Sequence, residues 1–181
     1  MRKMNNIVSE NLPKRKDIRL KNYDYSECGA YFITICTDKR RKVLSKIADI
    51  DFEIVGEGLS LPQLTQYGKM VDKWIKLIPE KYPNVTVDYY VIMPNHIHLL
   101  LSVIKEDGRE DPSPTVCTVI GWLKYNATKE INQLRKVTNE KIFQRSYYDH
   151  IVRNKTDYEE ISKYIYENPL KWQFDELYFE D

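Results

Sequence analysis

The sequence predicts an α+β fold, because runs rich in β-formers alternate with stretches whose apolar residues have helical spacing. The predicted strands are residues 30–38, 85–93, 96–103 and 141–154, and the predicted helices are residues 64–78, 116–134 and 155–169. The first six elements follow the βαββαβ order of a ferredoxin-like sandwich. The sheet of such a sandwich usually has its helices on one face, so we expect the extra C-terminal helix to cover the other face.

Each element depends on a local pattern. The strands at 30–38 ("AYFITICTD") and 85–93 ("VTVDYYVIM") are rich in β-branched and aromatic residues, and "PN" after the second predicts a tight turn into "HIHLLLSV". The first helix is marked by Leu64, Tyr67, Val71, Trp74, Ile75 and Ile78, and the second by Val116, Val119, Ile120, Leu123, Ala127, Ile131 and Leu134. Thr156 and Glu159 fit a capping box for the last helix, and Pro169 ends it. Residues 47–62 are compatible with a small hairpin around Gly56-Glu57-Gly58, and residues 105–114 read as a polar loop.

A chain of 181 residues suits one domain. We divide it into an N-terminal arm (1–27), a single domain (28–172) and an acidic tail (173–181). No apolar run approaches the length of a membrane helix, and the polar N-terminus has no signal-peptide core, so we expect a cytoplasmic protein without a membrane partner. Three cysteines (Cys28, Cys36 and Cys117) without a C-x-x-C pair favour buried free thiols over a disulfide framework or a zinc finger.

The net charge of +1 does not by itself indicate a nucleic-acid partner. Basic residues are concentrated in 14–21 ("KRKDIRLK") and 38–42 ("DKRRK"). Two interpretations of these segments stay open, a patch that binds nucleic acid and an ordinary solvated surface.

Two histidines, His96 and His98, lie in the predicted strand of "MPNHIHLLL". Alternation along the strand places His96, His98, Leu100 and Ser102 on one face and Ile97, Leu99, Leu101 and Val103 on the other. The second set is the core face, so the imidazoles lie side by side toward whatever covers the opposite side of the sheet. They are either two ligands of one metal ion, which needs a further ligand, or partly buried histidines that are hydrogen-bonded to neighbours.

The last predicted helix is the natural source of further ligands. Tyr164 and Asn168 are four residues apart and share one face, while Ile161 and Ile165 can dock the helix on the sheet and Tyr166 points away. The helix therefore offers a phenol and an amide oxygen to the histidine region. The alternative is a core tyrosine at Tyr164 and a C-terminal helix cap at Asn168.

These residues occur in three blocks that resemble a known family. "VIMPNHIHLLL" (91–101) resembles the histidine–hydrophobic–histidine (HUH) strand of the single-tyrosine transposases. "FQRSYYDHIVRNKTDYEEISKYIYENPLKW" (143–172) is similar to the C-terminal block of their REP-associated branch, in which Y-I-x-x-N-P closes the catalytic helix, and "ECGAYFITICTDKRRKVL" (27–44) is similar to that branch's first strand. The resemblance covers about residues 28 to 172 and implies the HUH endonuclease fold.

The resemblance implies that Tyr164 is the nucleophile and that His96, His98 and Asn168 hold Mg²⁺ or Mn²⁺. One departure is Asn168 itself, because insertion-sequence members have a glutamine four residues after the tyrosine. The implied activity is a metal-dependent endonuclease and strand transferase of single-stranded DNA. Tyr164 would attack a phosphodiester in line and leave a 5′-phosphotyrosine and a free 3′-hydroxyl.

The implied substrate is single-stranded DNA with hairpin elements near the cut. Candidates for DNA contacts are Lys124, Arg145, Tyr147, Tyr148, His150, Arg153 and Asn154. The two tyrosines could stack unpaired bases, and the other residues could contact the DNA backbone. Each is also compatible with an ordinary surface or core role, and His150 could instead take part in proton transfer or be purely structural.

Three other functions are compatible with parts of the pattern. They are an HUH nuclease of the replication-initiator type, a domesticated DNA-hairpin binder without activity, and a histidine metalloprotein unrelated to DNA. The chain has no motif for a helicase, and the intact set of His96, His98, Tyr164 and Asn168 argues against lost activity. A monomer and a homodimer both stay open, because the last helix of one subunit could serve the partner's histidines.

Overall fold

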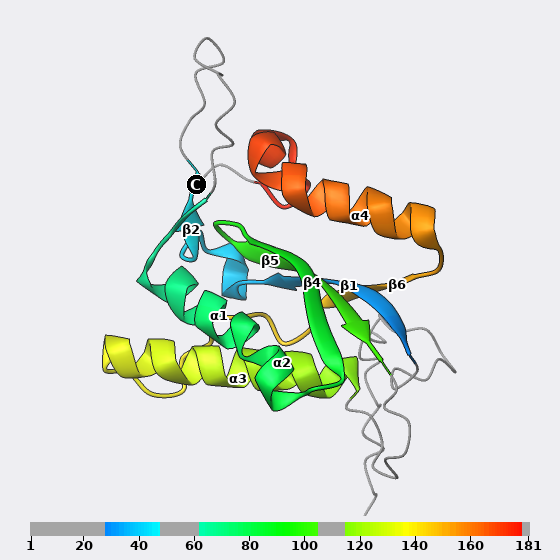
Figure 1. Ribbon diagram of the computed structural model, residues 1–181. Helices are drawn as coiled ribbons and strands as arrows, with labels where there is room; N and C mark the ends of the chain where they lie inside the picture. Colours follow the sequence, from blue (N-terminus) through cyan, green and yellow to red (C-terminus); the bar gives the residue numbers. More distant parts are fainter. Residues whose placement is uncertain (1–27, 48–61, 105–114, 179–181) are drawn as a thin grey trace, which may run out of the picture.

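The computed structural model describes residues 28–47, 62–104 and 115–178 (Figure 1). Its main sheet has the order β4-β5-β1-β6, and all neighbouring strands are antiparallel. The strands are β1 (Gly29–Cys36), β4 (Val85–Ile92), β5 (His96–Val103) and β6 (Tyr148–Val152). This strand order is that of a ferredoxin-like sandwich, which confirms the predicted fold class. The predicted hairpin around residues 56–58, the loop 105–114 and the arm 1–27 lie outside the described residues.

Helices cover both faces of the sheet. α1 (Gln66–Lys76), α2 (Ile78–Lys81) and α3 (Val116–Arg135) lie on one face, and α4 (Lys155–Glu167) lies on the other (Figure 1). A 3-10 helix, η3 (Asn168–Phe174), continues directly from α4. The remaining elements are η1 (Asp38–Arg40) and a small second sheet of β2 (Ser45–Lys46) and β3 (Gln63–Leu64). The expectation that the extra C-terminal helix covers the second face is confirmed.

The alternation along β5 separates two hydrophobic cores. Ile97, Leu99, Leu101 and Val103 belong to the larger core, with residues of β1, α1 and α3. Leu100, on the opposite face, belongs to a smaller core with Val91, Met93, Ile165 and Trp172. The predicted faces of the strand are therefore correct, and the histidines share the smaller core's face.

Two details at the ends of α4 differ from the sequence prediction. The N-cap is Asn154, whose extended backbone lets its side-chain oxygen accept a hydrogen bond from the Asp157 amide. Thr156 lies inside the first turn, so the predicted capping box is wrong. The α-helix ends before Pro169, as predicted, but the chain stays helical as η3 because a proline fits in a first helical turn.

The start of α1 is held close to the strand region by a glycine. A Cβ atom at Gly68 would collide with the backbone carbonyl oxygen of Leu44, so only glycine permits this approach. The cysteines are free thiols as expected, but Cys28 is exposed and the other two are only partly buried, so the expectation of burial is wrong. Among the described residues no helix is long and apolar enough to span a membrane.

Candidate active site

The two histidines of β5 converge on one point. His96 is fully buried and His98 is 3% exposed, and their Nε2 atoms lie 3.0 Å apart. Each Nδ1 is engaged elsewhere, that of His96 with the side-chain oxygen of Asn95 at 2.8 Å and that of His98 with the Thr34 hydroxyl at 2.9 Å. Because the Asn95 oxygen only accepts, His96 carries its proton on Nδ1 and presents a lone pair at Nε2.

Both imidazoles are held in the neutral form. Burial lowers the pKa of His96 to about 3, and the charge of Arg40 contributes in the same direction. Burial also holds the pKa of His98 well below its usual value, and neighbouring His96 adds to this effect. Neutral imidazole is the form that binds metal ions, so the pair is ready to ligate one near neutral pH.

The end of α4 lies over the histidines, as the sequence predicted. The Tyr164 hydroxyl is 3.3 Å from His98 Nε2, and the two rings are 5.2 Å apart between centroids. Ile165 is buried in the smaller core and Ile161 packs against it, while Tyr166 is 60% exposed. The structure therefore brings Tyr164 and the histidines together, and it rejects the alternative of a core tyrosine because Tyr164 is 44% exposed.

Asn168 is the C-cap residue of α4, as one of the two interpretations expected, and the first residue of η3, and it is 2% exposed. Its Nδ2 donates to Asp175 Oδ2 at 2.7 Å, whereas its Oδ1 is buried with no hydrogen-bond partner. A buried carbonyl oxygen without a partner is costly unless something else binds it. This orphaned oxygen supports a ligand role for Asn168.

Asp175 is a site residue that the sequence did not reveal. Ligand atoms of His96, His98 and Asp175 all lie within 4.8 Å of one another, a spacing that could hold one metal ion. Asp175 Oδ2 also accepts a long hydrogen bond from the Tyr164 hydroxyl, at 3.4 Å. In the sequence this aspartate is one of several acidic residues near the C-terminus, so composition alone did not distinguish it.

The chain after Asn168 folds back onto the histidine strand. Trp172 packs beside the His96 ring with centroids 5.9 Å apart, and Tyr178 packs on Trp172 at 5.2 Å. Asn95 Nδ2 donates to the Leu177 carbonyl at 2.9 Å. These contacts fix residues 172–178 against the site and place Asp175 beside both imidazoles.

The phenol of Tyr164 is strongly disfavoured from ionising. Burial raises its pKa to about 12, and the negative charge of Asp175 and a hydrogen bond to that carboxylate contribute. At neutral pH this tyrosine is therefore protonated. A positive charge beside it would be needed to make it a better nucleophile.

A cleft of about 800 Å³ opens over these groups. His98, Tyr164, Asn168 and Asp175 line it. Two of the tyrosines predicted to contact DNA, Tyr147 and Tyr148, also line it, and Tyr148 is 55% exposed. The cleft thus combines the site residues with aromatic rings that a base could stack on.

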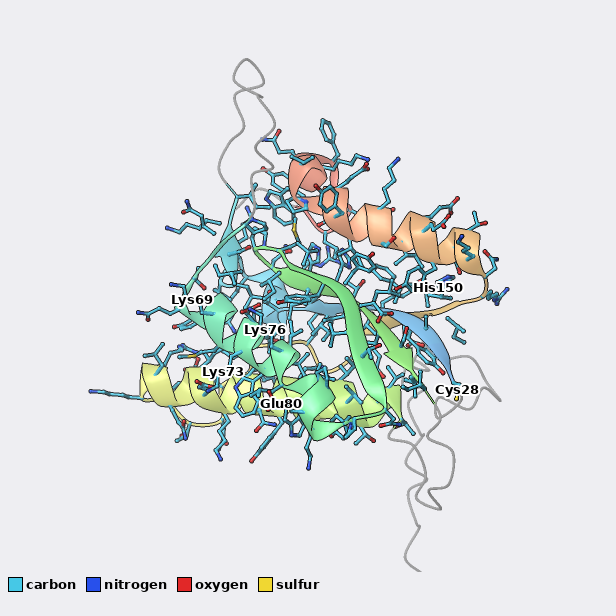
Figure 2. All side chains as sticks on the ribbon, in the orientation of Figure 1. Cys28, Lys69, Lys73, Lys76, Glu80 and His150 are labelled. Atoms are coloured by element: carbon cyan, nitrogen blue, oxygen red, sulfur yellow. The ribbon has the colours of Figure 1, made fainter. Side chains whose placement is uncertain are left out.

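The other predicted DNA contacts lie elsewhere. The Lys124 ammonium, on α3, donates to the carbonyls of Gln144 and Arg145 at 2.6 and 2.9 Å, and burial lowers its pKa. Together with Arg145 it lines a second groove. His150 is on β6 and lies beside the start of α4, far from η3 (Figure 2). Its Nε2 is 3.0 Å from an Asp157 carboxylate oxygen.

Arg153 and Asn154 belong to the same end of α4 as His150. The Arg153 amide donates to Asp157, and Asn154 is the helix cap. The structure does not bring these two residues or His150 to the cleft. Their hydrogen bonds are those of a helix start.

Comparison with known proteins assigns the family. The sequence model of the family described as "Transposase IS200 like" matches residues 24–168. The chain belongs to this IS200-like transposase family. Its members are DNA-processing enzymes, so this IS200-like chain is expected to process DNA as well. The match ends at Asn168 and does not reach Asp175.

Two relatives come from Haemophilus influenzae. One is an uncharacterized protein, 30% identical over 179 residues, with 91% of this chain and 93% of that protein covered. The other bears a name that assigns it to the REP-associated tyrosine transposases and is 28% identical over 168 residues, with 87% and 81% covered. This IS200-like transposase is thus similar to the REP-associated branch.

A solved structure shows the same fold. It is that of a REP-associated tyrosine transposase bound to a REP hairpin, with a TM-score of 0.53 and 20% identity, covering 81% of this chain and 70% of that one. The HUH fold expected from the sequence is therefore confirmed.

Proposed function

We propose that this chain is a transposase that cuts and rejoins single-stranded DNA through a 5′-phosphotyrosine at Tyr164. One observation carries the proposal: the Tyr164 hydroxyl lies 3.3 Å from Nε2 of His98, beside a second neutral imidazole. A nucleophile next to nitrogens that can hold a metal ion is one arrangement that supports phosphodiester cleavage.

The residues present fit a divalent cation, which we propose to be Mg²⁺ or Mn²⁺. His96 and His98 would supply Nε2 atoms, and the partnerless oxygen of Asn168 and the carboxylate of Asp175 would supply oxygens. Oxygen ligands suit both ions. A bound cation would neutralise charge on the phosphate and favour ionisation of the phenol.

The proposed covalent step uses Tyr164 as the nucleophile. Its oxygen forms a bond to phosphorus, and the bond between phosphorus and the 3′-oxygen breaks. The phenolic proton passes to solvent, to which the side chain is 44% exposed, and the leaving oxygen takes up a proton to become a 3′-hydroxyl. The tyrosyl ester keeps the bond energy, so attack by a 3′-hydroxyl reverses the step and joins strands.

The proposed partner is single-stranded DNA with hairpin elements of the kind found at repeats or insertion ends. The similarity to a relative that was solved with a REP hairpin supports this choice. Tyr147 and Tyr148 line the cleft, where unpaired bases could stack on them. Lys124, Arg145, His150, Arg153 and Asn154 stay candidates for contacts farther from the cut.

We further propose that the protein acts in the cytoplasm, as a monomer or a homodimer. The contact between Tyr164 and His98 of the same chain supports an active site formed in cis. The domain extends over 28–172 in this proposal, with an arm before it and an acidic tail after it. Asp175 belongs to the tail by sequence and to the site by position.

The test uses labelled single-stranded hairpin DNA with Mn²⁺ or Mg²⁺ and a denaturing gel. We expect a covalent protein–DNA adduct that is absent in Tyr164→Phe. Tyr166→Phe is the matched control, because that tyrosine is on the same helix and faces away from the site. Hairpin binding without any adduct would instead support the domesticated binder.

A further inference from the structure

A second groove lies along α3, outside the cleft. Its volume is about 710 Å³, and we call it the α3 groove. The lining residues that could contact a ligand through a charge, a ring or an amide are Lys124, Tyr125, Lys129, Lys141, Gln144 and Arg145. None of them has a part in the cleavage step described above.

The α3 groove is positively charged. Lys129, Lys141 and Arg145 are exposed, and none of the three forms an ion pair with a described residue. Among the described residues that line the groove, the one acid is Glu140, which is paired with Arg135 at 2.6 Å. The groove therefore offers unneutralised cations to an anionic ligand.

The described residues of the cleft give it no such surplus of positive charge. Its lining cations, Arg40 and Lys171, are matched in number by the acids Asp175 and Glu176. Without a bound cation, a DNA strand that enters the cleft places phosphates near Asp175 and gains little electrostatic affinity there from the side chains. A neighbouring basic surface would therefore add to the affinity for the strand.

The two hollows adjoin at Gln144, which lines both of them. The Lys124 ammonium ties the carbonyls of Gln144 and Arg145 to α3 and so fixes the segment that connects the hollows. Tyr125 is 66% exposed on the same helix and presents an aromatic ring at the groove. A basic track with an exposed ring is the arrangement that holds single-stranded nucleic acid.

We propose that the α3 groove binds the single-stranded DNA that continues from the cleft, with Tyr125 stacking a base and Lys129, Lys141 and Arg145 contacting phosphates. The proposal rests on the proposed function, because it assumes that the cleft receives a DNA strand. It adds a binding track beyond Gln144. The length of this track sets the length of the DNA strand that the protein holds.

The test measures fluorescence anisotropy of labelled thymidine oligonucleotides of about 4 and about 16 nucleotides. For the long oligonucleotide, we expect Tyr125→Ala to weaken binding by about fivefold or more. Lys129→Gln/Lys141→Gln should lower the slope of log K against log salt by about 1.4, because each lost phosphate contact removes about 0.7. Binding of the short oligonucleotide should stay as in the wild type.

Two controls match these changes outside the groove. Lys69→Gln/Lys81→Gln removes the same charge from exposed sites on α1 and α2, and Figure 2 shows Lys69 on α1. Tyr166→Ala removes an exposed tyrosine from α4. Wild-type affinity for both controls is part of the expected result, and equal losses in controls and groove variants would overturn the proposal.

Two other results would overturn the proposal as well. One is unchanged binding of the long oligonucleotide by the groove variants. The other needs a third probe, a labelled blunt hairpin stem: a loss confined to this stem would make the groove a duplex site. The proposed function fails separately, if no adduct forms at Tyr164 with the single-stranded hairpin DNA.

Discussion

Replacing Asp175 by asparagine should weaken divalent-metal binding in a protein that still folds, at the cost of one of the two hydrogen bonds that Asp175 accepts from Asn168 Nδ2 and the Leu177 amide. The substitution keeps the shape of the side chain but removes a charge that lies within 4.8 Å of both imidazole ligand atoms. A carboxylate oxygen that binds the cation directly would lie about 2.1 Å from it, and at an effective dielectric constant of about 20 a unit charge and a divalent cation at that distance attract by about 16 kcal/mol. Partial exposure and desolvation offset most of this energy. We expect a net loss of about 1.4–2.7 kcal/mol, or about 10- to 100-fold in affinity.

The assay is titration of the protein with Mn²⁺, with free Mn²⁺ followed by electron paramagnetic resonance. Glu176→Gln is the matched control, because it removes the same charge from the next residue, which lines the cleft but lies outside the cluster of ligand atoms. A second readout is the pKa of the Tyr164 phenol without metal. That pKa should fall in Asp175→Asn, because the carboxylate helps to raise it. Unchanged Mn²⁺ affinity in a folded Asp175→Asn protein would refute the reasoning.

Three further predictions concern stability. The folded pKa of His96 is lowered to about 3 and that of His98 is also lowered, so the unfolded state binds more protons below pH 6.5. The free energy of unfolding should therefore fall by up to about 1.4 kcal/mol per histidine per pH unit as pH drops from about 6.5, which urea titrations at several pH values would measure. In the same titrations, Asn154→Ala should lower the free energy of unfolding by about 1 kcal/mol and Thr156→Ala by at most about 0.5 kcal/mol. The reverse order would contradict the assignment of Asn154 as the N-cap. Gly68→Ala should cost about 1–3 kcal/mol, and an unchanged thermal midpoint would contradict the close approach at that glycine.

The strand that carries the histidines could be predicted because its structure depends on a pattern of neighbouring residues. Alternation along β5 decided which face His96 and His98 share, and the helical period decided that Tyr164 and Asn168 share a face. The order of the elements then placed that helix over the histidine face. Each step needed only the periodicity of one element and the order of the elements along the chain.

Asp175 could not be predicted in this way. Its position depends on η3 turning the chain back after Pro169, and on Trp172 packing beside His96. Such packing depends on which surfaces meet, and no repeat in the sequence records it. The carboxylate therefore looked like one more charge of an acidic tail.

The sequence did not predict the correct helix cap or the hydrogen-bond partners of Lys124, for a related reason. Thr156 and Asn154 are both good caps, and the path of β6 into the helix decides between them. Lys124 looks like a free surface cation in the sequence, but the fold gives its ammonium two carbonyl partners. Tertiary structure, not residue type, assigned both roles.

The most direct test of the central claim is to locate the DNA on the protein. The chain would be incubated with single-stranded hairpin DNA and Mn²⁺, digested with protease and nuclease, and analysed by mass spectrometry. The account predicts a nucleotide joined through a 5′-phosphate to the Tyr164 oxygen. A nucleotide on any other residue would contradict the assignment of Tyr164, whose hydroxyl lies beside His98.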